Sequence, residues 1–306
     1  FLLAPGPHFP LFALLRLVQG TAFALAFTGS VVVATEAAPK ERRAQAFGLL
    51  GMVAPLAQAL APRLGEALVG VGGYPLLFAS ALGWAGLGAV VCTAAWRGQS
   101  PDGARSAGSP RPFGGPTFGE PSAFALARRR DFRANLFAGF CFGFAFGAVL
   151  TFVPLAIRGA GLPAVGFFFT MQGAMVALTR LTLGSLADRF GKRRVILPAL
   201  ALLGASMVLL AAAHTERGFA AGALLMGFSH GLLFPAMMAL AVDRAEAEEA
   251  GSVVALFGGA FNLGMLVSGF SLGPVAEAFG FAALFGLAAA LTWAGFLAFL
   301  LGDPRN

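Results

Sequence analysis

Nine runs of about 20 predominantly apolar residues, separated by short polar or charged segments, dominate this 306-residue chain. That length is what a helix needs to cross the hydrocarbon core of a bilayer. Only 11% of the residues are charged, whereas a soluble domain carries about 25%. The pattern predicts an all-α polytopic membrane protein, because helices satisfy their own backbone hydrogen bonds in lipid. The expected spans are 10–35, 44–69, 75–96, 132–157, 164–187, 195–213, 218–242, 251–273 and 279–301.

The basic side chains are distributed unevenly over the segments that join these runs. Sixteen of the 21 Lys and Arg lie in connections on one side, and two lie on the other. Short loops rich in Lys and Arg stay in the cytoplasm, so the C-terminus is expected there. The net charge of +7 therefore indicates a lipid bilayer as partner, not a nucleic acid. The Ala-, Gly- and Arg-rich composition points to the inner (plasma) membrane of a bacterium.

A charged hinge at 184–194 separates two of the apolar runs and carries five charges in eleven residues. Gly184 is expected where a helix closely approaches a neighbour, since small residues permit such contacts in membranes. Gly191 is expected to turn the chain with a positive φ. Asp188, at a helix end, can accept from backbone N–H groups or pair with an arginine.

The hinge resembles the signature loop of the major facilitator superfamily of secondary transporters, G-x-L-a-D-r-x-G-r-r/k-r/k. The matching residues are Gly184, Leu186, Asp188, Arg189, Gly191, Arg193 and Arg194. The resemblance implies two pseudo-symmetric helical lobes, a monomer, alternating access and a gating role for these residues at the cytoplasmic closure. An ordinary basic cytoplasmic loop is the alternative.

A segment rich in Gly, Pro, Ser and Arg, 98–130, is expected to be a flexible cytoplasmic linker. It separates a partial N-terminal lobe of three spans, 1–97, from a lobe of six spans, 131–306. An internal repeat crosses it: Gly-Tyr-Pro-Leu-Leu-Phe at 73–78 corresponds to Gly-Phe-Ala-Ala-Leu-Phe at 280–285. Because the family has six helices per lobe, the resemblance implies an N-terminally truncated transporter holding about helices 4–12 of twelve. A genuine nine-span protein is the alternative.

The first span contains a second motif of the family, l-x-x-R-x-x-q-G, which Arg16, Gln19 and Gly20 match. An arginine inside a span is costly and usually faces a cavity or a paired group. Gln19 follows three residues later, on the same helix face. The resemblance implies a role for Arg16 in proton transfer; the alternative is that its side chain extends to the outer interface.

The second span resembles the antiporter motif of the family's fifth helix, which Gly48, Pro62 and Gly65 match. Two central glycines of that motif are replaced by Ala57 and Ala61. Small residues still permit close helix packing, but the replacement weakens the case for an exporter.

Four polar side chains inside the C-terminal spans are candidates for a substrate or proton pathway. They are Gln172, Arg180, His230 and Asn262. Arg180 is close enough to a span end to serve equally as an interfacial anchor. His230 titrates near neutral pH in water, but a packing role is the alternative.

The chain shows no metal-ligand spacing, phosphate-binding loop or nucleophile motif, so neither an enzyme nor a cofactor or metal is expected. The resulting hypothesis is a secondary active transporter that exports a small, partly apolar molecule in exchange for protons. Proton-linked uptake of a metabolite such as an organic acid is the second hypothesis, with Arg16 or Arg180 binding its carboxylate. The third, of another class, is a non-transporting membrane sensor or an inactive remnant.

Overall fold

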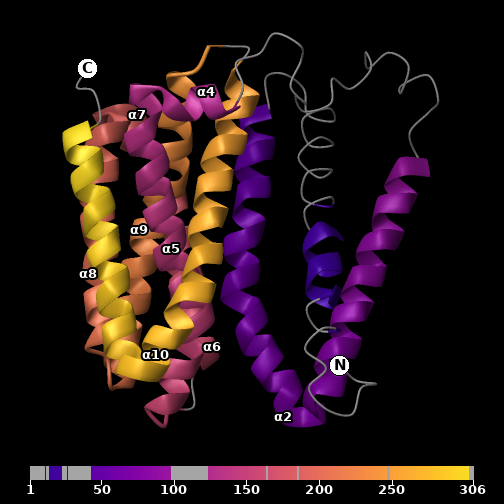
Figure 1. Ribbon diagram of the computed structural model, residues 1–306. Helices are drawn as coiled ribbons and strands as arrows, with labels where there is room; N and C mark the ends of the chain where they lie inside the picture. Colours follow the sequence, from indigo (N-terminus) through magenta and orange to yellow (C-terminus); the bar gives the residue numbers. More distant parts are fainter. Residues whose placement is uncertain are drawn as a thin grey trace. The chain divides into compact units, whose positions relative to one another are not determined.

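The computed structural model describes residues 11, 14–22, 26, 43–97, 123–162, 165–184, 186–246 and 249–302, which are helical apart from short turns (Figure 1). They fall into two compact units, Phe1–Ala54 with Leu64–Phe113, and Pro55–Arg63 with Gly114–Asn306. We call these the N-terminal and C-terminal units and describe each by itself. The helices are α2 Arg43–Arg97, α4 Ala123–Arg128, α5 Arg130–Gly159, α6 Val165–Leu183, α7 Leu186–Phe190, α8 Lys192–Ala211, α9 Glu216–Asp243 and α10 Ala250–Gly302.

Five stretches of the described chain are long and apolar enough to cross a membrane. They are Val53–Ala94, Phe132–Gly159, Lys192–Ala211, Glu216–Asp243 and Ser252–Gly302. This confirms the predicted class, an all-α polytopic membrane protein. Helix α6, with 19 residues, is a further apolar helix. In the first predicted span, residues 14–22 are helical.

The two longest helices, α2 and α10, each contain two of the predicted spans. A single glycine interrupts each: Gly73 has φ 68° and ψ −170°, and Gly280 has φ 80° and ψ 174°. Almost only glycine adopts this backbone conformation. The two glycines lie 207 residues apart, at equivalent positions of the predicted repeat. The structure therefore gives both copies of the repeat the same turn between consecutive spans.

The C-terminal unit is built around a close contact between α5 and α10, which run side by side (Figure 1). A Cβ atom at Gly143 of α5 would collide with the carbonyl oxygen of Phe261, and one at Gly264 of α10 with that of Phe140. Small residues of this kind let membrane helices pack backbone against backbone. The two helices therefore lie closer together than larger residues would permit.

Phenylalanine fills much of the core that these helices enclose. Several phenylalanine rings of α5 are buried, including Phe142, Phe144 and Phe152, while Phe137 is 40% exposed. Most of the phenylalanine rings of this helix thus pack between helices. The largest fully buried aromatic side chains of the unit are Phe132, Phe142, Phe168, Phe257, Phe285 and Phe299.

The short helix α4 lies within the segment expected to be a linker. Its Leu126 is buried with Phe132, Ala241 and Val253, so α4 packs onto the ends of α5, α9 and α10. Residues 98–122 of the expected linker lie outside the described residues.

We expect Gly264→Ala to lower the free energy of unfolding by about 1–3 kcal/mol, because the added methyl group overpacks the α5–α10 contact. Gly269→Ala is the matched control on the same helix, since nothing lies within 4 Å of its Cβ position. Thermal unfolding of the purified variants in detergent measures the difference. Equal melting temperatures for the two variants would contradict the assigned contact.

Candidate functional site

His230, near the middle of α9, lies among aromatic rings in the C-terminal unit. Its side chain is 8% exposed, and its ring centroid lies 5.3 Å from that of Phe142 and 4.7 Å from that of Phe146, both edge-on. Phe261 of α10 contacts the same two rings, with centroids 5.0 and 5.8 Å away. We call Phe142, Phe146 and Phe261 the aromatic box. It exists because the glycine contact of α5 with α10 brings these rings together.

Helix α6 presents polar side chains to α9 next to this box. Gln172 and Thr179 lie two helical turns apart on one face of α6 and are at most 2% exposed. Gly227 and Gly231 of α9 pack directly against them: a Cβ at Gly227 would meet the Gln172 backbone, and one at Gly231 the Thr179 side chain. We call Gln172, Thr179 and His230 the polar seam.

The polar seam holds groups without a hydrogen-bond partner among the described residues. These are both polar atoms of the Gln172 amide, the Thr179 hydroxyl oxygen and His230 Nδ1. Most buried polar side-chain atoms in proteins have such a partner, and each one that lacks it requires an explanation. The seam is therefore the candidate binding site of the C-terminal unit.

Three of the four polar candidates in the C-terminal spans thus meet at the contact between α6 and α9. Arg180 follows Thr179 on α6, is half-buried and lies close enough to His230 to act on it electrostatically. Asn262 is exposed on α10, next in sequence to Phe261 of the aromatic box. Thr179 was missed from the sequence; its spacing of seven residues from Gln172 was the available signal.

The hinge joins α6, which ends at Leu183, to α8, which begins at Lys192, through the short helix α7. Gly191 has φ 89°, which confirms the expected positive φ. At Gly184 the atom of the described residues that restricts the Cβ position is the carbonyl oxygen of Arg180, at the end of α6, so the expected close approach of a neighbouring helix stays a prediction. Gly184 N–H also donates to that oxygen at 3.1 Å.

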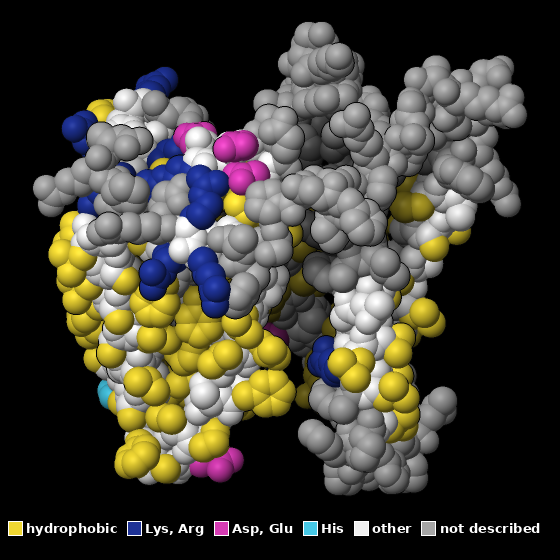
Figure 2. Space-filling model, turned by 45° about the horizontal axis from the view of Figure 1, so that its top comes forward, with side chains coloured by type: hydrophobic (Ala, Val, Ile, Leu, Met, Phe, Trp, Pro, Cys, Tyr) yellow, Lys and Arg dark blue, Asp and Glu magenta, His cyan; other side chains and the backbone are white. Residues whose placement is uncertain are grey.

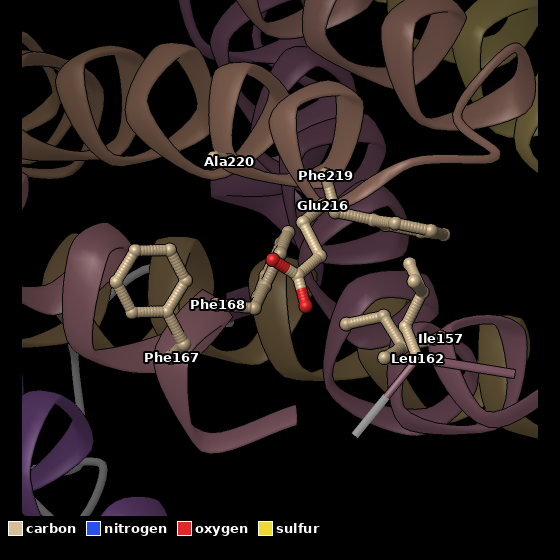
Figure 3. A pocket seen from close by; sticks show the side chains of 7 residues that line it. All are labelled: Ile157, Leu162, Phe167, Phe168, Glu216, Phe219 and Ala220. Carbon is tan, nitrogen blue, oxygen red and sulfur yellow. The ribbon is translucent and has the colours of Figure 1, made fainter. Parts of the chain in front are cut away.

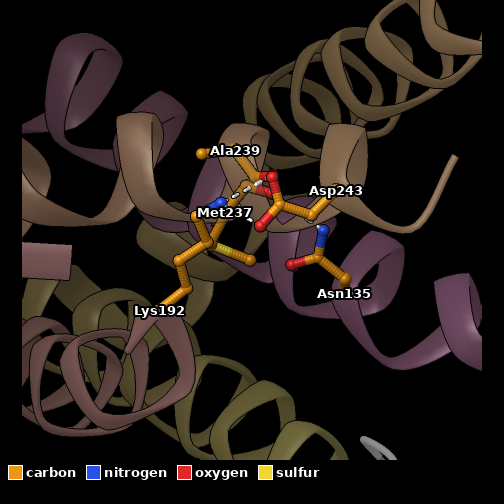
Figure 4. Close-up of polar contacts among 5 residues, drawn as sticks. All are labelled: Asn135, Lys192, Met237, Ala239 and Asp243. Carbon is orange, nitrogen blue, oxygen red and sulfur yellow. Dashed lines mark hydrogen bonds and ion pairs between the residues drawn. The ribbon is translucent and has the colours of Figure 1, made fainter. Parts of the chain in front are cut away.

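Two basic residues of the hinge connect it to the ends of other helices. Lys192 forms an ion pair with Asp243 at the end of α9 and also donates to the Ala239 carbonyl at 3.4 Å (Figure 4). Arg193 donates from Nη2 to the Leu300 carbonyl of α10 at 2.7 Å. Sequence reasoning selected Arg193 but missed Lys192 and Asp243, which lie 51 residues apart in the chain.

The other predicted gating residues show fewer contacts. Arg189 and Arg194 are exposed. Asp188 lies in α7, but its side chain is outside the described part of the structure, so its pairing with basic neighbours stays a prediction.

Further polar contacts join helices at the same end of the unit. Asn135 donates from Nδ2 to the Met237 carbonyl at 3.0 Å, which connects α5 to α9 (Figure 4). Arg129 pairs with Glu249 at 2.9 Å, and the glutamate side chain is only 7% exposed. Figure 2 shows Lys and Arg side chains gathered at this end, above a largely hydrophobic flank. We call it the hinge end.

The two other motifs lie in the first predicted span and in α2, and Pro62 of the second motif belongs to the stretch Pro55–Arg63 of the C-terminal unit. Arg16 donates from Nη1 to Gln19 Oε1 at 3.0 Å, so the two side chains do share a helix face, and both are exposed together with Gly20. Gly48, Pro62 and Gly65 all lie in α2. A Cβ at Gly65 would make an ordinary contact of 3.6 Å with Leu77 in the second half of that helix.

A metal centre has no support in the described ranges, where no group of three His, Cys, Asp or Glu could hold an ion.

Comparison with known proteins agrees with this architecture. The protein is 29% identical over 148 residues to "Inner membrane transport protein YajR" of Escherichia coli K12, covering 48% of this chain and 32% of that protein. It is 29% identical over 161 residues to an uncharacterized MFS-type transporter of Pseudomonas aeruginosa PAO1, covering 53% and 40%. An uncharacterized MFS-type transporter of Burkholderia mallei SAVP1 is 28% identical over 150 residues, covering 49% and 37%.

The aligned regions thus span only about a third to two fifths of the length of these relatives. The family model described as Major Facilitator Superfamily matches residues 1–165 and again 136–306. Together the two matches cover the whole chain, so it belongs to the major facilitator superfamily.

Proposed function

We propose that this protein is a secondary active transporter that exports a small, partly apolar molecule by alternating access, in exchange for protons. The observation that carries the proposal is the polar seam beside the aromatic box. It combines apolar contact area with polar groups that have no hydrogen-bond partner among the described residues. Binding sites for small molecules commonly have this composition, mostly apolar with a few placed polar groups.

In this proposal the aromatic box binds the apolar part of the substrate, and the polar seam binds its polar part. Phe142, Phe146 and Phe261 offer ring edges and faces to an apolar substrate. The Gln172 amide offers one acceptor and two donors, which fix the orientation of a polar substituent. Because the rings are packed against His230 in the described conformation, substrate entry requires that they separate.

His230 is the group in the seam through which proton binding could be coupled to that separation. A charged imidazolium is unfavourable when buried among phenylalanine rings with no partner at Nδ1. Proton binding therefore goes together with opening of the box to water. Conversely, closure around a bound substrate favours release of the proton from His230. Substrate and proton therefore bind alternately, which exchanges one for the other across the membrane. Arg16, bonded to Gln19 in the N-terminal unit, is a second proposed member of the proton pathway.

The hinge end is proposed as the cytoplasmic gate. The Lys192–Asp243 pair and the bond from Arg193 to Leu300 hold α8, α9 and α10 together there. Opening this end breaks or rearranges such contacts, so their strength sets how often it opens. The positive-inside rule supports a hinge end and a C-terminus in the cytoplasm. The name of the Escherichia coli relative supports a location in the inner membrane.

Uptake of an organic acid is the second candidate function. It draws on Arg180, which follows Thr179 on α6 and whose guanidinium suits a carboxylate in charge and geometry.

Dye accumulation in cells that express the gene tests the direction of transport. We expect expression to lower the accumulation of an apolar dye, and a proton uncoupler to abolish the difference, because export against a gradient needs the proton gradient. A panel of organic acids measured in parallel is the comparison. Acid uptake that collapses on uncoupling would overturn export in favour of import.

Replacing polar groups of the seam separates function from stability. We expect Gln172→Leu and Thr179→Val to keep the free energy of unfolding or raise it by up to about 1–2 kcal/mol, because each removes a buried group without a described partner. Transport should nevertheless fall at least about tenfold, since loss of a substrate hydrogen bond costs about 1.4 kcal/mol or more.

Thr292→Val is the matched control, because the Thr292 hydroxyl is buried but already bonded within its own helix, to the Ala288 carbonyl at 2.7 Å. Unchanged transport in both seam variants would show that the seam does not bind substrate. A transport loss matched by a loss of stability would assign the seam a structural role.

A charge swap tests the gate. We expect Lys192→Asp and Asp243→Lys each to reduce transport several-fold by placing like charges together at the hinge end, and the double variant to recover most of it. Membrane insertion, measured by protein level in the membrane fraction, should not change in any of the three. Failure of the double variant to recover would exclude the pair as the gating contact.

A further inference from the structure

The stretch Pro55–Arg63 of α2, which belongs to the C-terminal unit, packs directly against α6. Thr170 of α6 donates from its hydroxyl to the Ala59 carbonyl at 2.7 Å. A Cβ atom at Gly173, one turn further along α6, would lie 2.6–2.7 Å from the nitrogen, Cα and Cβ of Ala59. The backbone of α2 at Ala59 therefore touches the residue that directly follows Gln172 of the polar seam.

Gln58 lies beside the same contact on α2, because it directly precedes Ala59. Its side chain is half-buried, and its Nε2 atom is buried without a hydrogen-bond partner among the residues that the structure describes. Pro62, one turn later, has no N–H, so the Gln58 carbonyl lacks the donor that a regular helix would supply at that position. Gln58 thus presents an unsatisfied donor inside an apolar span, where polar groups are costly.

Each of the two helices therefore carries one carboxamide directly beside the contact. Gln172 is 0% exposed, and within the described chain neither its amide nitrogen nor its amide oxygen has a hydrogen-bond partner. Buried polar atoms without a partner are rare in proteins. Two such amides on helices that touch one residue away indicate a ligand that bonds to both.

The two amides determine the chemistry of that ligand. Gln58 Nε2 is a donor, whereas the Gln172 amide offers one acceptor and two donors, and neither group is charged. An uncharged carboxamide matches both, because its carbonyl accepts and its N–H donates. A carboxylate would leave the Gln172 acceptor unsatisfied, and an ammonium group would leave the Gln58 donor unsatisfied, so both would bind more weakly.

The hollow where α6 and α9 begin is not an alternative site for such a molecule (Figure 3). It has room for about one water molecule. The rings of Phe168 and Phe219 in its wall are 1% and 4% exposed, so their faces are already covered. The groups available to an organic amide are therefore those beside the contact of α2 with α6.

We propose that Gln58 binds the substrate together with Gln172, and that the polar part of the substrate is an uncharged carboxamide. Gln58 Nε2 donates to the carbonyl of this group, and Gln172 Oε1 accepts from its N–H. This role rests on the proposed function, because it adds a residue and a substrate class to the same site. Binding of an amide can be measured without transport, so either proposal can fail while the other stands.

Tritiated acetanilide is a suitable probe, because it joins one phenyl ring to one carboxamide. We expect the purified full chain in lipid nanodiscs to bind it saturably. Phenyl acetate has a similar shape and the same carbonyl but no N–H. It should therefore displace the probe only at about fivefold to tenfold higher concentration than unlabelled acetanilide does.

Two variants separate the roles of the two amides. Gln58→Met keeps the length of the side chain and removes the donor to the carbonyl, so it should weaken acetanilide and phenyl acetate alike, about fivefold to tenfold. Gln172→Leu removes the acceptor for the N–H, so it should weaken acetanilide more and abolish the preference for the amide. The melting temperature should fall in neither variant, because each change removes a buried amide group without a described partner.

Leu60→Met is the matched control, since it introduces the same side chain two residues away from Gln58, at a position that is 58% exposed. Glu216→Gln is a control for the hollow, because Glu216 is the acid in its lining. Both variants should bind acetanilide as the wild type does.

Two kinds of outcome would overturn the proposal. Equal affinity of the wild type and Gln58→Met, or an equal loss in Leu60→Met, would remove Gln58 from the site. Absence of saturable acetanilide binding by the wild type, or equal competition by phenyl acetate, would exclude the carboxamide class. Dye accumulation in cells remains the separate measurement of transport.

Discussion

Close contact between glycine-bearing helix faces is the constraint on which the C-terminal unit depends. In lipid, helices gain little from burying apolar side chains against one another, so they associate where their surfaces fit closely. Gly143 and Gly264 bring the backbones of α5 and α10 together, and Gly227 and Gly231 do the same for α9 on α6. The aromatic box and the polar seam are the side chains that these contacts leave facing one another.

The same contacts explain why the seam is unsatisfied in the described conformation. Gly227 packs onto the Gln172 backbone so closely that the neighbouring amide has no described partner. Tight packing and unsatisfied polar groups oppose each other: the first stabilises the closed seam, and the second disfavours it by about 1–3 kcal/mol per group. A seam balanced in this way can open at modest cost, which is the property that the proposed alternating access requires of this candidate site.

Most of the fold could be predicted from the sequence, because its signals are local. Hydropathy over about 20 residues locates the spans, a glycine before a basic cluster marks the turn at Gly191, and spacing of three residues places Arg16 and Gln19 on one face. Equivalent glycines in the repeat, Gly73 and Gly280, also carry the same φ and ψ in the structure. In each case the information lies within one element or one repeat unit.

The site could be predicted only in part, because it depends on which helices meet. Gln172 and His230 could be selected as polar residues in apolar spans. Thr179 is recognised as part of the site only through its contact with Gly231. Lys192 and Asp243 are ordinary loop and helix-end charges until α8 and α9 are placed side by side. Such pairings follow from the packing of separate helices, and no pattern within a single span encodes them.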